Sequence, residues 1–91
     1  MNLQDKIVLY ITSKKVISDK ARAKRESQNI DEGSKMGLIL KRHEQAYTDS
    51  LEVSLKLIEY SKGHDVSVLL SNTSNPETWT KELLLDVMKL D

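Results

Sequence analysis

The longest periodic pattern of apolar and polar positions lies in the middle of the chain and predicts a helix over residues 31–62. Its polar side chains fall within a narrow arc, while its apolar side chains occupy a broad one. The centre of the apolar arc holds small or polar residues: His43, Ser50, Ser54 and Ser61. A wide apolar arc with such a seam is typical of a helix contacted by two neighbours, one of them closely.

The length of this predicted helix has a consequence for assembly. A straight helix over these residues would extend roughly 48 Å, whereas a compact chain of this size has a radius of gyration of about 12 Å. The helix therefore either breaks near Gly33–Gly37 or projects and needs a partner. We predict a homo-oligomer, at least a dimer, that associates through one helix face: Met36, Leu40, His43, Tyr47, Leu51, Ser54 and Ile58.

The C-terminal pattern predicts a second helix, over residues 76–90. Asn75 has the side chain of an N-cap, Pro76 fits the first helical position, and Glu77 places an acid in the first turn. The apolar residues that follow recur at helical spacing, so this helix presents one face to the core.

The two remaining apolar segments, residues 6–12 and 65–71, are predicted as short strands because the first is rich in β-branched and aromatic residues and the second alternates at its start. Residues 15–28 contain good helix formers but few apolar anchors, which indicates a marginal helix. The expected fold is mainly α with two short strands, in the order β-α-α-β-α around one long central helix. An all-α hairpin or bundle is the alternative, since the first segment also fits a helical face.

Composition narrows the class of protein. Ninety-one residues with 38% hydrophobic and 31% charged side chains suffice for a single small domain, here residues 1–91. The longest apolar run, Ile7–Ile11, is far shorter than the ~18 residues of a membrane span. Cysteine is absent, which excludes disulfides and thiolate metal sites. We expect no membrane association and a cytoplasmic location.

Catalytic patterns are not found. The two histidines, His43 and His64, lack a metal-ligand spacing. The serines lack a nucleophile elbow, and with three glycines in the chain no phosphate-binding loop follows an apolar segment. We therefore predict no catalytic residue, no cofactor, no metal site and no enzymatic activity.

Charge is balanced overall but not along the chain. Residues 1–43 carry ten Lys/Arg and five Asp/Glu, whereas residues 44–91 carry four and nine. The excess cations lie in one segment and are candidate anion or nucleic-acid contacts: Lys14, Lys15, Lys20, Arg22, Lys24 and Arg25. The alternative is that this segment faces the acidic half of the chain.

The function hypothesis follows from these exclusions. We expect a small protein-interaction or regulatory module, of the adaptor or inhibitor type and of the kind found among phage or plasmid accessory proteins. It self-associates and acts by binding a partner protein. The alternative is a sequence-independent nucleic-acid-binding protein that uses residues 14–25, because no base-reading or stacking residue accompanies the cations.

Overall fold

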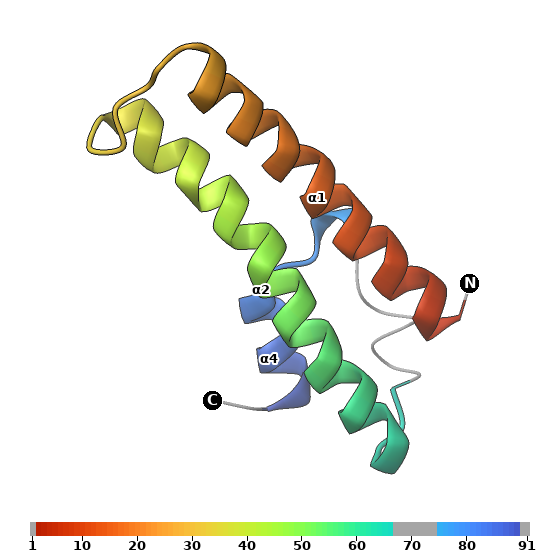
Figure 1. Cartoon of the computed structure of the whole chain (residues 1–91). Coiled ribbons are helices and arrows are strands. Elements are labelled where there is room, and N and C mark those ends of the chain that lie inside the picture. The colour runs from red at the N-terminus through yellow and green to blue at the C-terminus, as the bar shows by residue number, and fades with distance from the viewer. Residues whose placement is uncertain (1, 67–74, 90–91) are drawn as a thin grey trace.

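The computed structural model describes residues 2–66 and 75–89, which form two long helices and two short ones. Helices α1 (Leu3–Ser27) and α2 (Lys35–Gly63) lie side by side and antiparallel (Figure 1). The 3-10 helix η1 (Pro76–Thr78) packs against α1, and α4 (Lys81–Met88) packs against α2. The extents of 46 × 26 × 19 Å describe an elongated hairpin rather than a sphere.

The predicted β-α-α-β-α order is wrong, because the described residues are 81% helical and contain no strand. Residues 6–12 lie inside α1, which also absorbs the marginal helix predicted over residues 15–28. Residues 67–71 of the second predicted strand lie outside the described residues, and residues 65–66 are not in a strand. The all-α alternative is the observed fold class.

Packing explains why residues 6–12 are helical despite their β-branched composition. Ile7 and Tyr10 lie on one helical face and are 5% and 1% exposed, while Val8 points to solvent. A strand would have turned Ile7 and Tyr10 to opposite sides. The helix places both against residues of α2 and η1, and this burial outweighs a weak local preference.

The turn between the two long helices accounts for the shifted start of α2. Ser34 caps the helix: its Oγ accepts a hydrogen bond from the Gly37 amide at 3.0 Å. Asn29, in the turn, takes a left-handed conformation with φ 54°, which asparagine tolerates better than most residues. A Cβ on Gly37 would collide with the main-chain carbonyl of Asp31, so glycine permits this close approach.

The C-terminal segment begins as predicted but is broken into two pieces. The Asn75 side chain accepts from the Glu77 amide at 3.2 Å, and Pro76 takes the first position of η1. Thr80 then caps α4, its Oγ1 accepting from the Leu83 amide at 3.1 Å. The break at Trp79 lets its ring meet Tyr10 edge-on, with centroids 5.8 Å apart. The single helix predicted over residues 76–90 is therefore divided in two, and the break allows the Trp79 ring to be buried.

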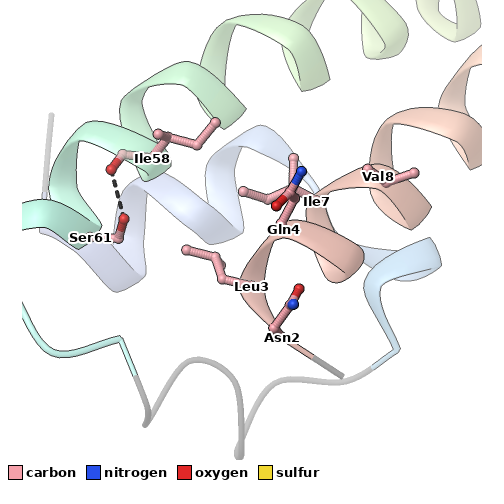
Figure 2. A pocket seen from close by; sticks show the side chains of 7 residues that line it. All are labelled: Asn2, Leu3, Gln4, Ile7, Val8, Ile58 and Ser61. Carbon is pink, nitrogen blue, oxygen red and sulfur yellow. Dashed lines mark hydrogen bonds between the residues drawn. The ribbon is translucent and has the colours of Figure 1, made fainter.

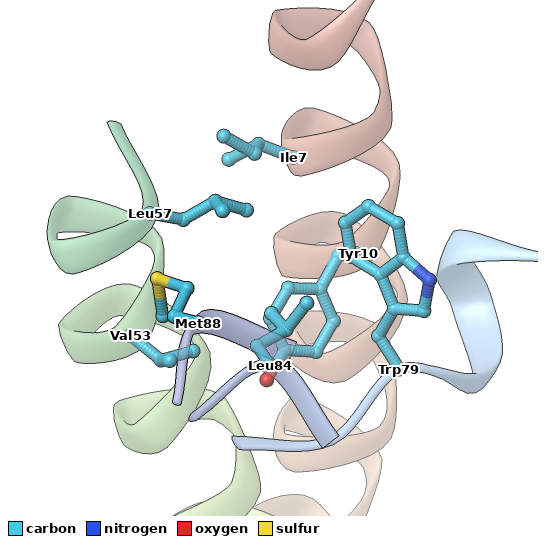
Figure 3. Packing of buried hydrophobic residues seen from close by; sticks show 7 residues of the cluster. All are labelled: Ile7, Tyr10, Val53, Leu57, Trp79, Leu84 and Met88. Carbon is cyan, nitrogen blue, oxygen red and sulfur yellow. The ribbon is translucent and has the colours of Figure 1, made fainter. Parts of the chain in front are cut away.

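One hydrophobic cluster joins α1, α2, α4 and Trp79, the residue that follows η1 (Figure 3). It lies in the open half of the hairpin, which comprises residues 3–14 of α1 and 50–63 of α2. Its buried members are Ile7, Tyr10, Val53, Leu57, Trp79, Leu84 and Met88. The turn half, residues 15–27 of α1 and 35–49 of α2, lacks such a cluster, and its buried positions on α1 are the small residues Ser18 and Ala21.

Candidate interaction surfaces

The hairpin leaves many large apolar side chains exposed. Within the described residues they come from both long helices: Val8, Val16, Ile17, Met36, Leu38, Ile39, Leu51, Leu55 and Ile58. Single exposed apolar residues are ordinary, but contiguous ones mark interaction sites. Two grooves between α1 and α2 collect several of these residues, and they lie on opposite sides of the hairpin.

The front groove lies in the open half, between the start of α1 and the end of α2 (Figure 2). It has a volume of about 550 Å³ and no charged side chain lines it: its walls are Asn2, Leu3, Gln4, Ile7, Val8, Ile58 and Ser61. Helix α4 passes behind it in Figure 2. The front groove is therefore an uncharged apolar surface on the side of the hairpin away from α4.

An apolar stripe on α2 extends the front groove toward the middle of the hairpin. Leu51, Leu55 and Ile58 follow one another at spacings of four and three residues, so they share one helix face. They are 41%, 69% and 42% exposed. With Val8 across the groove they form what we call the front face, consisting of Val8, Leu51, Leu55 and Ile58.

The rear groove lies in the turn half and is smaller, with a volume of about 240 Å³. Its lining residues are Ile17, Lys20, Ala21, Lys24, Leu40 and His43. Around α1, Tyr10 lies about 40° from Lys24 of the rear groove and about 160° away from Val8 of the front groove. Because Tyr10 belongs to the cluster that holds η1 and α4, the rear groove continues the side that these helices cover.

The six cations predicted as one anion-binding segment do not form one surface. Lys14 Nζ donates to the main-chain carbonyl of Glu77 at 3.2 Å and lies 5.9 Å from the centre of the Tyr10 ring. Arg22 and Arg25 pair with Glu44 at 3.4 and 2.8 Å. The remaining three, Lys15, Lys20 and Lys24, are exposed. Of the six, Lys20 and Lys24 line the rear groove.

The face predicted for self-association is likewise divided. Leu40 and Ser54 are 5% and 2% exposed, while Tyr47 is half-buried. Met36, His43, Leu51 and Ile58 are exposed, and Ile58 lines the front groove. Of the residues predicted at the centre of the apolar arc, Ser50 and Ser54 are buried, whereas His43 is exposed. Sequence reasoning missed Val8, which it assigned to a strand, and Leu55, which it left outside the arc.

Side chains that could ligate a metal ion are dispersed in the described ranges. No group of three or more His, Asp or Glu side chains there could hold a metal ion. His64 stacks on the Tyr60 ring with centroids 4.1 Å apart, and its Nδ1 lies 3.2 Å from the Tyr60 carbonyl. None of the helices in the described residues has the length and hydrophobicity needed to cross a bilayer.

Comparisons with protein-family models, with curated proteins and with solved structures find no match for this chain. The two grooves and the front face are the features from which a function can be argued.

Proposed function

We propose that this chain is a non-enzymatic protein-interaction module that self-associates through the front face of its helical hairpin. The observation that carries the proposal is the front face itself: it has four large apolar side chains, 41% to 69% exposed, and two of them, Val8 and Ile58, line an uncharged groove. In a chain with 31% charged residues, such a surface is costly to leave in water.

The chemistry of the front groove favours a second copy as the occupant. A two-fold interface places each lining residue near the same residue of the other copy, so a charged lining would repel itself. The front groove is lined by apolar residues, Asn2, Gln4 and Ser61, and two copies meet there without like-charge contacts. Two hairpins joined in this way form a four-helix arrangement, with apolar stripes packed as in helical bundles.

The length of the central helix does not support this proposal, because α1 runs along α2. The front face takes the place of that argument. An adaptor or inhibitor role, in which the module occupies a surface of a partner protein, is the functional class we assign to such a hairpin.

Sedimentation equilibrium tests self-association. The unmodified protein should have an apparent mass of at least twice 10.4 kDa at low-micromolar concentration. Leu55→Glu should return it to 10.4 kDa with unchanged helical content, because Leu55 is mostly exposed in one hairpin. Leu38→Glu is the matched control, since Leu38 is also exposed on α2 but lies in the turn half, outside the front face. A monomeric unmodified protein, or equal effects of the two variants, would contradict the proposal.

A further inference from the structure

The rear groove differs from the front groove in both charge and shape, and these differences indicate a different occupant. Two of its six lining residues are lysines, and none is acidic. Lys20 and Lys24 lie one helical turn apart on α1 and are exposed. Two copies meeting at this groove would bring these four ammonium groups together, so a second copy of the chain is a poor occupant.

Between the lysines and α2 the groove has an apolar floor. Ala21 and Leu40 are 3% and 5% exposed and close the base, while Ile17 is 41% exposed and stands at the edge. A ligand that matches this surface must bring apolar side chains for the floor and negative charges for the lysines. Phosphodiester groups would satisfy the lysines but would leave the apolar floor without a partner.

The fold shows what kind of element this side of the hairpin accepts. In the open half, η1 and α4 already lie on the rear side, where Leu84 and Met88 pack against Val53 and Leu57 (Figure 3). Lys81 of α4 is anchored by Asp49 and Glu52 of α2 at 3.8 and 3.3 Å. In the open half, the hairpin therefore binds α4 through its apolar face, and an ion pair beside that face holds it in place.

We infer that the rear groove is a docking site for a short acidic amphipathic helix of a partner protein. Its apolar face lies on Ile17, Ala21 and Leu40, and its carboxylates pair with Lys20 and Lys24. The distance along α1 from Ile17 to Lys24 is roughly 10 Å, about two turns of helix. The occupant is thus similar in length to α4, with the charges of the ion pairs reversed.

A pair of synthetic peptides tests this inference. Each is an amphipathic helix of about 15 residues with leucine on one face, long enough to form some helix alone. Glutamate occupies the polar face of one peptide and lysine that of the other. In fluorescence anisotropy at low salt, the acidic peptide should bind the full-length protein and the basic peptide should not. The acidic peptide should bind more weakly as salt is added, because its carboxylates are screened from the lysines.

Substitutions locate the binding site. Lys20→Glu with Lys24→Glu should lower the affinity for the acidic peptide by about tenfold or more, because two attractions become repulsions. Lys15→Glu with Lys56→Glu is the matched control: it changes the net charge equally but alters neither groove, and it should leave affinity nearly unchanged. Lys20→Gln with Lys24→Gln gives a milder second test, and circular dichroism checks that each variant is folded. Ile17→Ser should also weaken peptide binding, because it removes an apolar side chain at the edge of the groove.

The outcomes separate this inference from its alternatives. Equal binding of both peptides, or equal losses in the two Glu double variants, would overturn it. So would salt-sensitive binding of duplex DNA or RNA that exceeds peptide binding and is lost with Lys20 and Lys24. Leu55→Glu, which targets the front face, should leave peptide binding intact, so failure of self-association and failure of this site are distinguishable.

Discussion

The open half and the turn half of the hairpin hold the same two helices together by different means. In the open half, η1 and α4 seal the rear side with large side chains, and Trp79, Leu57 and Leu84 are fully buried. In the turn half no third element covers the pair in the described structure. There the contact rests on small side chains such as Ser18 and Ala21, and on the ion pairs of Arg22 and Arg25 with Glu44.

The open half therefore contributes most of the stability, while each half carries one of the two grooves. Apolar burial is the largest stabilising contribution in a small domain, and it is concentrated in the open half. The rear side of the turn half stays accessible because nothing in the described residues occupies it. Two lysines line the groove there, and their like charges would disfavour a second copy as the occupant. The open half, sealed at the rear, exposes its uncharged front instead.

The largest expected effect of a substitution is in the open half. Leu57→Ala should lower the free energy of unfolding by about 2–5 kcal/mol, because it leaves a cavity in the central cluster. Leu38→Ala, on an exposed residue outside both grooves, should change it by no more than about 0.5 kcal/mol. Urea denaturation measures both. Similar losses would mean that the central cluster is not the main source of stability.

The sequence pattern does not single out Leu57; the helix face that it predicts for self-association includes Leu51 and Ile58 instead. Periodicity identifies the apolar arc of a helix, and the described structure confirms a helix over most of residues 31–62. It does not show where on a broad arc each neighbour docks. That depends on α1 and α4, which turn Val53 and Leu57 inward and leave Leu51 and Ile58 at the edge.

The same limit explains the wrong strand. Residues 6–12 are apolar all round, so their periodicity fits a strand and a buried helix equally well. The deciding contacts come from Trp79 and Leu57, which are distant in sequence. The cap at Asn75 was predictable because it depends only on neighbouring residues. The rear groove was predictable only in part. Its lysines stand out in the sequence, but Leu40, which completes its floor, comes from α2 and is distant in sequence.

The next effect tests the close approach at the turn. Gly37→Ala should cost about 1–3 kcal/mol, because the added methyl group meets the fixed Asp31 carbonyl rather than a movable side chain. Gly63→Ala is the control: nothing lies within 4 Å of its added methyl group. It should be neutral or stabilising by up to about 1 kcal/mol, since alanine favours the helix. Thermal unfolding of both variants gives the comparison, and a stabilised Gly37→Ala protein would contradict the turn geometry.

Alkaline pH should weaken the open half. Burial, with smaller contributions from Asp49 and Glu82, raises the pKa of Tyr10 from 10.0 to about 12. The unfolded chain loses this proton near pH 10 and the folded chain keeps it. Stability from this group is therefore full below pH 10 and falls by up to about 1.4 kcal/mol per unit until pH 12. Tyr10→Phe should remove this part of the pH dependence in urea titrations. An unchanged dependence would mean that Tyr10 ionises as it does in water.

The smallest effect concerns the ion pairs of the turn half. Glu44 is 17% exposed in its side chain and receives both Arg22 and Arg25, and Arg25 also contacts Glu32 at 3.2 Å. Glu44→Gln should cost about 0.5–1 kcal/mol, and the loss should shrink as salt is added. Lys62→Gln breaks the exposed ion pair with Glu59 and should have no measurable effect.

Glu44→Gln also releases two arginines on the half of the hairpin that carries the rear groove. If residues 14–25 served nucleic acid, this variant should bind duplex DNA more tightly than the unmodified protein at low salt. We expect instead lower stability and no gain in DNA binding, because Lys14 is engaged by the Glu77 carbonyl and Lys20 and Lys24 line the rear groove, which leaves few cations beside the released arginines.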